Sequence, residues 1–325
     1  MMAQYIRINQ ADNVAVALAP LKAGTPIDID GVVLRDDIPA GHKFALCNLS
    51  QGDNVVKYGF PIGHVTRAVN AGCHIDHNTL KTNLDGVSEY TYTPNLTEIE
   101  SAAVKRSFKG FKRANGDVGI RNQIWIIPTV GCVNGIAQKL AERFSSEVAG
   151  RMGSVDAIVA FPHNYGCSQL GGDHENTRKI LRNMVLHPNA GGVLVVGLGC
   201  ENNQMSAFRP MLGNIDECRI KMFEAQKVSG DEVEYGLGLL REIFAVCSKD
   251  VREYVPMSAL RVGLKCGGSD GLSGITANPL LGLFSDWLVA QGGTTVLTEV
   301  PEMFGAETIL MNRCESRVVF DKTVA

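Results

Sequence analysis

Short apolar runs separated by turn residues fill the first 85 residues of the chain. The runs YIRI, NVAVAL, GVVL, KFAL and NVVKYG alternate with polar stretches, and a Pro- and Gly-containing turn spans residues 20–26. Apolar runs of this length, bounded by Gly, Pro, Asn and Asp, are typical of short β-strands. We therefore predict a small β-rich domain over residues 1–85.

The next segment has no sustained period. Residues 86–108, GVSEYTYTPNLTEIESAAVKRSF, are mostly polar. Such composition is typical of a connection between domains. We interpret residues 86–108 as a linker and residues 109–325 as a second domain.

Strand-like runs and helical segments alternate in this second domain. Strands are predicted at residues 123–130, 157–161, 192–198, 260–264 and 294–300, and helices at residues 135–149, around 180–185, at 231–246 and from 278. In the first helix, Ile136, Leu140, Phe144 and Val148 recur every four residues and form one face. Continuous apolar strands that alternate with helices indicate a buried, mainly parallel sheet. The predicted fold class is therefore α/β, with a small β-rich domain preceding the α/β domain.

Charge and cysteine content exclude several classes of function. The chain has 31 basic and 34 acidic residues, interspersed, with a formal net charge of −3, so we expect no nucleic-acid partner. No stretch approaches the roughly 18 consecutive apolar residues of a membrane helix, and the N-terminal residues do not resemble a secretory signal. We therefore expect no membrane partner and a cytoplasmic location. The nine cysteines, spread from Cys47 to Cys314, fit reduced thiols better than a disulfide framework.

Four predicted strands lead into loops that combine glycine with cysteine. The cysteines are Cys132, Cys167, Cys200 and Cys266. Ligands of open α/β sheets bind outside the carboxyl ends of the strands, so these thiols could converge there as metal ligands or polar contacts. The alternative is that each packs as a small buried hydrophobe. The chain has no CxxC pair of the kind that indicates a zinc site.

Two glycine-rich loops resemble phosphate-binding loops only in part. The sequence GLGCEN from Gly197 lacks the third glycine of a dinucleotide-binding turn, and CGGSDGLSG from Cys266 lacks the GK[ST] of a phosphate loop. The second loop still offers many backbone donors to a small acid, and the alternative interpretation is a tight turn.

Two imidazoles and a carboxylate are close together at His74, Asp76 and His77. In an extended segment His74 and Asp76 point to one face, which makes them the better ligand pair. A surface loop with incidental histidines is the alternative. We interpret His42, His64 and His187 as structural or solvated.

The same segments resemble a known family. Residues 111–122 (FKRANGDVGIRN), PTVGCVNGIA from Pro128, HNYGCSQLG from His163, GLGCENNQ from Gly197, CGGSDGLSGITANP from Cys266 and TEVPEMFGAE from Thr298 resemble successive signatures of the altronate/galactarate dehydratase family. The loops are more similar to those of its altronate-acting members. Residues 1–85 are similar to the SAF-type domain that opens these enzymes. The resemblance covers essentially the whole chain.

Two departures from the family pattern concern one histidine motif and the length. Where the altronate-acting members tend to read H-V-H-x-H-N, this chain has HIDHN from His74, so the resemblance carries over only His74. Family members continue past a segment like residues 317–325 into motifs such as NPSPGNKAGG and STGRGTPYG. We therefore expect an α/β domain that is incomplete at its C-terminal side.

The resemblance implies a hydro-lyase of hexuronate catabolism. It would convert D-altronate to 2-dehydro-3-deoxy-D-gluconate and water, with Fe²⁺ or Mn²⁺ stabilising the charge that develops at the substrate carboxylate. The expected metal contacts are His74, Asp76, Cys167 and Cys200. His163 is the candidate base or acid, with Tyr165 and Glu201 as further groups for proton transfer. Arg121, Gly267, Gly268, Ser269 and Asp270 are the expected substrate contacts, with a structural salt bridge as the alternative for Arg121.

The sequence is also consistent with other substrates and with an inactive chain. The substrate could be galactarate or a sulfonated hydroxy acid, or the chain could be an inactive fragment that binds sugar acids without turnover. The expected partner is a small sugar acid, and a homo-oligomer is possible.

Overall fold

The computed structural model describes residues 4–83, 89–268, 270–303 and 305–325. Its contacts divide the chain into two compact units. One unit is formed by residues 104–260, and the other by residues 1–103 together with residues 261–325. The predicted α/β domain of residues 109–325 is therefore divided at residue 261 between two units.

Residues 4–83 contain two small antiparallel sheets. The first contains, in spatial order, β1 (Tyr5–Ile6), β2 (Val14–Ala17), β3 (Lys43–Ala45) and β6 (His74–Ile75). The second contains β4 (Asn54–Lys57), β5 (Phe60–Val65) and β7 (Leu80–Lys81). All four residues of β2 are buried, and Phe44 packs with Ile38 in the core below. The predicted β-rich domain is confirmed.

A four-stranded parallel sheet forms the centre of the unit of residues 104–260. Its order is β11 (Ile158–Ala160), β10 (Gln123–Pro128), β12 (Ala190–Gly197) and β13 (Ile220–Glu224). Seven of the eight residues of β12 are buried. A strand buried on both faces requires a continuous apolar run, and GVLVV provides it.

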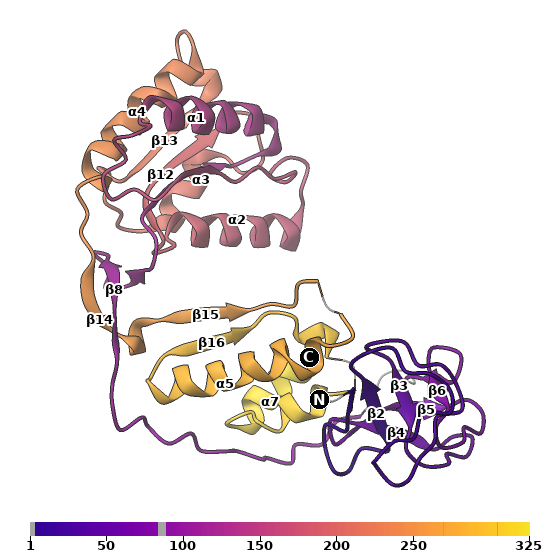
Figure 1. Cartoon of the computed structure of the whole chain (residues 1–325). Coiled ribbons are helices and arrows are strands. Elements are labelled where there is room, and N and C mark those ends of the chain that lie inside the picture. The colour runs from indigo at the N-terminus through magenta and orange to yellow at the C-terminus, as the bar shows by residue number, and fades with distance from the viewer. Residues whose placement is uncertain (1–3, 84–88, 269, 304) are drawn as a thin grey trace. The chain divides into compact units, whose positions relative to one another are not determined.

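Helices cover both faces of this sheet (Figure 1). The helices of the unit are α1 (Asn134–Glu147), α2 (Gly171–Val185), α3 (Met205–Phe208) and α4 (Glu232–Cys247), with short 3₁₀ turns η1 (Gly131–Val133), η2 (Arg209–Leu212), η3 (Ala225–Lys227) and η4 (Met257–Ala259). Alternate residues of each strand point to opposite faces. Ile124 and Ile126 of β10 thus pack with α1 and α4, whereas Trp125 and Ile127 pack with α2 and α3.

A second, antiparallel sheet lies within the same unit. It consists of β14 (Glu253–Pro256), β8 (Ser107–Lys112) and β9 (Val118–Gly119). Two of its strands come from opposite ends of the unit's sequence, so their pairing brings the start and the end of residues 104–260 together.

The C-terminal residues add a separate, two-stranded parallel sheet. It pairs β15 (Arg261–Leu264) with β16 (Thr294–Leu297). The remaining elements are η5 (Ser273–Ile275), α5 (Ala277–Ala290), η6 (Val300–Glu302), α6 (Glu307–Met311) and α7 (Arg317–Val324). Among the described residues, no helix is long and apolar enough to cross a membrane.

The strand order corrects one prediction. Residues 260–264 and 294–300 were expected to extend the same sheet as β10, β11 and β12, but they form the separate pair β15 and β16. The fourth strand of the main sheet is β13, which the sequence did not suggest. Its sequence, IKMFE, has a charged residue at the second and last positions, and only Phe223 is buried, because β13 lies at the sheet edge.

The predicted linker also differs from the structure. From residue 89 the segment is extended and hydrogen-bonded to the residues between α6 and α7: the Tyr92 hydroxyl donates to the Cys314 carbonyl at 2.7 Å, and the Asn95 amide donates to the Asn312 carbonyl at 2.7 Å. Tyr92 also packs against Phe320. Residues 107 and 108 already belong to β8. A segment without periodicity can still be ordered when its hydrogen bonds are made with distant parts of the chain.

Candidate functional site

Three loops interlock at one edge of the parallel sheet, after the carboxyl ends of β10, β11 and β12. The Gly131 amide donates to the Tyr165 carbonyl at 2.9 Å, and the Asn134 side chain exchanges two hydrogen bonds with the backbone of His163. The Asn203 amide donates to the Gly166 carbonyl at 3.4 Å. The predicted convergence of the loops is confirmed for these three strands. The fourth loop, after β15, belongs to the other unit.

Glycine is required where two of these loops touch. A Cβ atom on Gly131 would lie 2.8 Å from the His163 carbonyl oxygen. Gly166 has a φ of +97°, and a Cβ there would lie 2.2 Å from the carbonyl oxygen of Thr129. Larger residues would push the loops apart. Glycine was predicted to allow close approach of the backbone to a ligand, and at these two positions it allows close approach of one loop to another.

Three cysteines are exposed on the interlocked loops. Cys132, Cys167 and Cys200 lie one on each loop. The alternative in which each packs as a small hydrophobe does not apply to them; it describes Cys247 and Cys314, which are buried. The Cys200 sulfur lies 3.7 Å from the amide nitrogen of the Gln226 side chain, a weak polar contact.

His163 is held by hydrogen bonds at both ring nitrogens. Nε2 lies 2.8 Å from the Pro128 carbonyl oxygen, and Nδ1 lies 3.1 Å from the Tyr165 amide nitrogen. A carbonyl only accepts and an amide N–H only donates, so the ring must be the neutral tautomer with its proton on Nε2. Neither nitrogen is then free to take a substrate proton. This geometry does not fit the predicted role of His163 as general base, and it fits a residue that joins the β10 and β11 loops.

Tyr165 is the exposed member of this pair. Its ring stacks on that of His163, with 6.1 Å between ring centroids, and 58% of the residue is exposed. Both side chains line a cavity of about 550 Å³ between the β11 loop and α2, whose wall also includes Phe161, Asp173 and Ile180. Tyr165 is therefore the predicted proton-transfer residue that the structure leaves accessible.

Glu201 is buried and fully engaged, with only 1% exposed. Its carboxylate accepts from the Thr129 hydroxyl at 2.7 Å, the Leu198 amide at 3.1 Å and the Gly199 amide at 2.6 Å. Burial raises the pKa of the carboxyl, but hydrogen bonds from Thr129 and the backbone amides outweigh it and lower the pKa. The predicted proton transfer by Glu201 does not fit this geometry. The ionised carboxylate is occupied by these hydrogen bonds and stabilises the β12 loop.

Arg121 lies at the opposite edge of the sheet. It precedes β10, whereas the interlocked loops follow the carboxyl end of that strand. Six strand residues separate the two edges by about 20 Å. Within this unit Arg121 does not reach the loops of His163 and Cys167, so its predicted contact with a substrate carboxylate there is not supported.

The glycine-rich loop after β15 is shaped by Asp270. This carboxylate accepts from the amides of Leu272 at 2.8 Å and Ser273 at 2.9 Å, and these hydrogen bonds lower its pKa. Asp270 thus organises a turn, which supports the tight-turn alternative at this position. Gly267 and Gly268 are exposed, and Ser269 lies outside the described residues.

His74 has a partner that sequence spacing did not reveal. Its Nε2 lies 2.9 Å from Nδ1 of His42, and its amide donates to Asp36 at 2.9 Å. β3 and β6 are neighbours in the sheet, which brings residue 42 beside residue 74. Burial lowers the pKa of His74. His42 was interpreted as structural or solvated because the sequence showed no chemistry around it.

Asp76 begins a turn and does not continue a strand. Its carboxylate accepts from the Asn78 amide and side chain, each at 2.9 Å, and from the Thr79 hydroxyl. Burial raises the pKa of Asp76, yet these hydrogen bonds outweigh it and lower the pKa. The extended arrangement of residues 74–76 that led to the predicted ligand pair therefore ends at Ile75.

The four predicted metal ligands are divided between the two compact units. His74 and Asp76 belong to the unit that contains residues 1–103, and Cys167 and Cys200 to the unit of residues 104–260. Within the ranges that the structure describes, no three His, Cys, Asp or Glu side chains form a group that could hold a metal ion. The residues of either unit thus do not fit a finished Fe²⁺ or Mn²⁺ site, and the cofactor stays a prediction.

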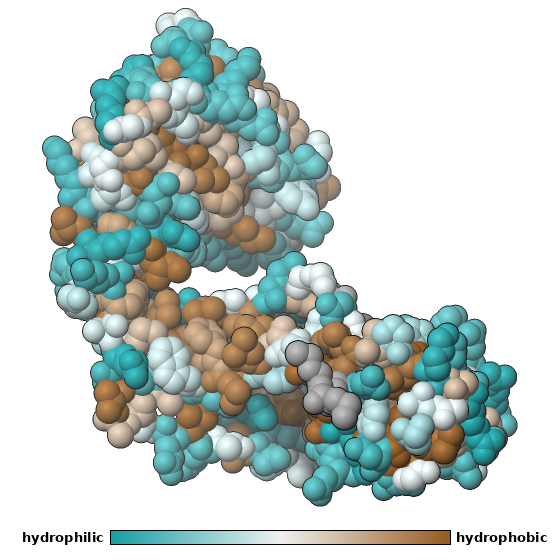
Figure 2. All heavy atoms as spheres, viewed as in Figure 1, coloured by the Kyte–Doolittle hydropathy of each residue, from teal (hydrophilic) through white to brown (hydrophobic). Residues whose placement is uncertain are grey.

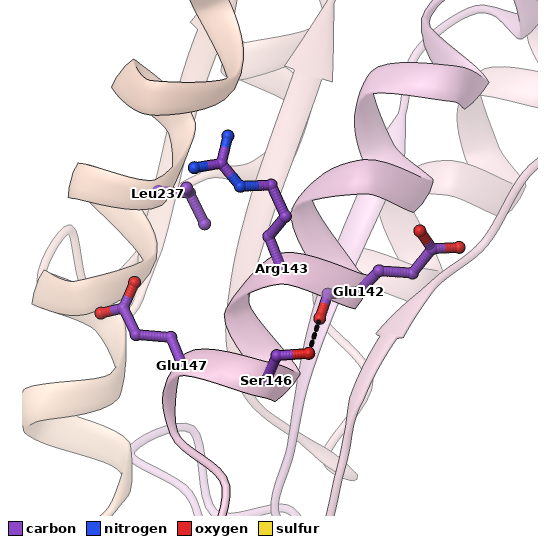
Figure 3. Close-up of a pocket in the computed structure, with 5 residues that line it drawn as sticks. All are labelled: Glu142, Arg143, Ser146, Glu147 and Leu237. Atoms are coloured by element: carbon purple, nitrogen blue, oxygen red, sulfur yellow. Dashed lines mark hydrogen bonds between the residues drawn. The ribbon is translucent and has the colours of Figure 1, made fainter.

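A hollow between α1 and α4 has a structural explanation (Figure 3). It is lined by Glu142, Arg143, Ser146, Glu147 and Leu237. Glu147 pairs with Arg241 at 2.7 Å, Arg143 pairs with Glu234, and the Ser146 hydroxyl donates to a carbonyl of its own helix. Arg143 and Glu147 are thus already partnered, and the hollow lies in the last half of α1, away from the loops.

Family models match almost the whole chain in succession. The altronate/galactarate dehydratase SAF domain matches residues 3–83, the second domain of D-galactarate dehydratase/altronate hydrolase matches residues 110–248, and the C-terminal D-galactarate/altronate dehydratase model matches residues 257–325. The division at residues 257–261 thus occurs both in the family models and in the compact units.

Individual relatives give the same result. The chain is 53% identical to the altronate dehydratases of Bacillus subtilis (strain 168) and Escherichia coli (strain K12), over 99% of its own length and 65% of theirs. It is 33% identical to the galactarate dehydratase (L-threo-forming) of Escherichia coli, over 97% of this chain and 62% of the relative. The chain thus spans just under two thirds of the length of these relatives. From its first described strands to its last helix, it belongs to the altronate/galactarate dehydratase family.

Proposed function

We propose that this protein takes part in the dehydration of a sugar acid, D-altronate, to 2-dehydro-3-deoxy-D-gluconate. The observation that carries the proposal is the edge of three interlocked loops, which exposes Tyr165, Cys132, Cys167 and Cys200 at the carboxyl ends of parallel strands. This is where open α/β sheets bind their ligands. The substrate is suggested by the 53% identity to two proteins named altronate dehydratase.

The proposed reaction removes water across one carbon–carbon bond. The C2 proton is abstracted, the C3 hydroxyl leaves with a proton as water, and the resulting enol tautomerises to the C2 ketone. The C2 proton lies beside a carboxylate, so it is weakly acidic until the charge of the enediolate is stabilised. Groups that donate hydrogen bonds to the substrate carboxylate are therefore needed in addition to a base.

Roles are proposed for the residues at the loop edge. Tyr165, exposed and stacked on His163, is our candidate for proton transfer at the substrate. His163 is proposed as a positioning residue, because both its ring nitrogens bind backbone. In the other unit, the amides of Gly267 and Gly268 stay proposed contacts of the carboxylate.

A divalent metal is a further part of the proposal. Fe²⁺ or Mn²⁺ would act as a Lewis acid on the substrate carboxylate. His74 and Asp76, with His42 as a neighbour of His74, remain proposed ligands in one unit, and Cys167 and Cys200 remain proposed ligands in the other. Metal content after anaerobic purification, compared between the chain and its His74→Ala variant, tests this independently of activity.

Altronate is preferred over galactarate because the identity is 53% to the altronate enzymes and 33% to the galactarate enzyme. A sulfonated hydroxy acid is a third candidate. Cytoplasmic location and a homo-oligomeric state also belong to this proposal, and neither bears on the choice of substrate.

The deciding experiment measures 2-keto-acid formation by the 325-residue chain, purified without oxygen and supplied with Fe²⁺ or Mn²⁺. Altronate, galactarate and a sulfonated hydroxy acid are compared, with the Bacillus subtilis relative as a positive control. Turnover of altronate alone supports the proposal. Turnover of another acid refutes the substrate, and no turnover beside an active control, with calorimetric binding of altronate, indicates a chain that binds without catalysis.

A further inference from the structure

Lys57 of β4 is a buried lysine without an acidic partner. It is only 9% exposed, and its ammonium forms no ion pair or hydrogen bond with a described residue of its own unit. The ammonium lies 4.6 Å from the centre of the Tyr58 ring. Hydrophilic side chains are common on the face of the β-rich domain at the right of Figure 2, so an exposed lysine there would need no explanation. A buried one does, because burial of a charge without an opposite charge costs free energy.

A second lysine extends from the same core cluster. Ala45 of β3 and Val55 of β4 pack in one cluster, and Lys43 and Lys57 each lie two residues away from them along these strands. Side chains two residues apart on a strand share a face, so both lysines lie at the margin of this cluster. Burial and then the neighbouring charge of Lys57 lower the pKa of Lys43. Two cations are thus close enough to repel each other.

Asp76 offsets part of this repulsion. Its charge raises the pKa of Lys43, against the effects of burial and of the second lysine. The Asp76 carboxylate already accepts hydrogen bonds from Asn78 and Thr79, and among the described residues it forms no ion pair with either lysine. One occupied carboxylate therefore faces two ammonium groups, and a further anion would be attracted to them.

The glycine-rich loop after β15 packs on the β-rich domain beside these lysines. A Cβ atom on Gly271 would lie 3.0 Å from the carbonyl oxygen of Gly41, and one on Gly274 would lie 1.9 Å from the hydroxyl oxygen of Tyr58. Loop and domain belong to the same compact unit. Gly41 and Tyr58 are within two residues of the two lysines. The contact thus brings the loop to the positions at which the lysines emerge.

Tyr58 has a backbone conformation that is rare for its residue type. Its φ is +61°, that of Gly59 is +80°, and the two residues form the turn between β4 and β5. Turns with two positive φ angles usually have Asn or Asp before Gly, because larger side chains are strained there. Strained residues cluster at ligand-binding sites. Here the strained conformation puts the Tyr58 ring beside the ammonium of Lys57 and its hydroxyl against the loop.

The loop also has hydrogen-bond donors that are not used. The amides of Gly267, Gly268 and Gly271 donate no hydrogen bond to a described residue. The Asp270 carboxylate is engaged by amides of its own turn. Backbone N–H groups and ammonium groups are the donors that bind carboxylates.

We propose that Lys57, assisted by Lys43, binds the carboxylate of the sugar acid where the β-rich domain meets the glycine-rich loop. The inference deepens the proposed function and rests on it for the identity of the ligand. The two ammonium groups neutralise the carboxylate, and amides of the loop donate to its oxygens. Lys57 then has an opposite charge only while the acid is bound, which explains a buried cation without a partner.

Calorimetric binding to the 325-residue chain tests the inference with D-altronate, galactarate and altritol. Altritol, the polyol without a carboxylate, should not bind. Lys57→Met keeps the length of the side chain and removes its charge, so it should weaken acid binding by at least about tenfold, and Lys43→Met should weaken it less. The matched control is Lys81→Met, at an exposed strand position of the same domain, which should change the Kd by less than about twofold.

Thermal unfolding of the same variants separates ligand binding from folding. The ammonium of Lys57 is buried and unpaired, so its removal should leave the Tm unchanged or raise it. D-Altronate should raise the Tm of the parent chain more than that of Lys57→Met, because a ligand that binds the folded state stabilises it. A lower Tm of Lys57→Met, with an unchanged Kd for the acid, would show a structural role and overturn the inference.

The outcomes distinguish the inference from the proposed function, which is judged by 2-keto-acid formation. Binding of any of the acids that depends on Lys57 supports the inference, whether or not product forms. Turnover of altronate with unchanged affinity in Lys57→Met overturns the inference and leaves the proposed function standing. The inference is also overturned when no acid binds, when altritol binds as tightly as altronate, or when Lys81→Met weakens binding as much as Lys57→Met.

Discussion

The hydroxyl of Thr129 donates a 2.7 Å hydrogen bond to the carboxylate of Glu201, and both residues are buried. Thr129 follows β10 and Glu201 follows β12, so this bond ties two of the three interlocked loops together. The carboxylate also accepts two amides of its own loop. A charge buried in this way is stable only while its hydrogen bonds are made.

Replacement of Glu201 by Gln should therefore destabilise the unit of residues 104–260. An amide has one acceptor oxygen and places an NH₂ group where an acceptor is needed, so the variant should lose about 1–3 kcal/mol in free energy of unfolding. Urea denaturation measures the loss. Glu142→Gln, at an exposed position of α1, is the control and should change stability by less than about 0.5 kcal/mol. An unaltered stability of Glu201→Gln would contradict this stabilising role.

The same carboxylate should make stability depend on pH. Because hydrogen bonds lower the pKa of Glu201 in the folded protein, it binds fewer protons than in the unfolded chain near the ordinary glutamate value of about 4.3. Its contribution is complete above that value and is lost as the pH falls through the folded-state pKa. Urea titrations between neutral and acidic pH should show a steeper loss for the parent chain than for Glu201→Gln. Parallel curves would show that Glu201 titrates normally.

His163 should act through position rather than through proton transfer. Its Nε2–H donates to the Pro128 carbonyl, a bond that an asparagine side chain can in part replace. We expect His163→Phe to lower kcat by at least about tenfold and His163→Asn to recover part of the loss, with the pH–rate profile unchanged in shape. Loss of one limb of the profile in His163→Asn would instead identify His163 as the titrating base.

Alkylation should separate the cysteines into two groups. Cys132, Cys167 and Cys200 are exposed, whereas Cys247 is fully buried, and burial raises the pKa of its thiol to about 11. Because the thiolate is the reactive form, Cys247 should react with iodoacetamide at least about a hundredfold more slowly at pH 8. Mass spectrometry of peptides follows each site. In urea the difference should disappear, and its persistence there would exclude burial as the cause.

Arg121→Ala should leave substrate binding nearly unchanged. Arg121 precedes β10 at the opposite edge from the interlocked loops. A bidentate contact with the substrate carboxylate would make its loss raise KM at least about tenfold, whereas we expect a change within about twofold. Steady-state kinetics with altronate distinguishes these two changes in KM. Tyr165→Phe is the variant for comparison, because Tyr165 is exposed at the loop edge.

Local patterns in the sequence determined much of this protein. Alternating apolar runs predicted β10, β11, β12 and the helices around them, since strand and helix periods are written in neighbouring residues. Ligands of open α/β sheets bind outside the carboxyl ends of the strands, so the loops with glycine and cysteine after these strands were the predicted site. The resemblance of the same loops to known sequences indicated the family. None of this required knowledge of contacts between distant residues.

Only the tertiary structure decided which strands are neighbours and which polar groups are free. β13 joins the main sheet and β15 and β16 do not, because pairing depends on packing across the whole unit. Glu201 and His163 were predicted from the sequence to transfer protons, yet their side chains form hydrogen bonds with Thr129 and Pro128. His42 meets His74 through two adjacent strands, although 32 positions separate them. The sequence determined the residue types at each loop, but the partners of each side chain come from long-range contacts, which no local pattern records.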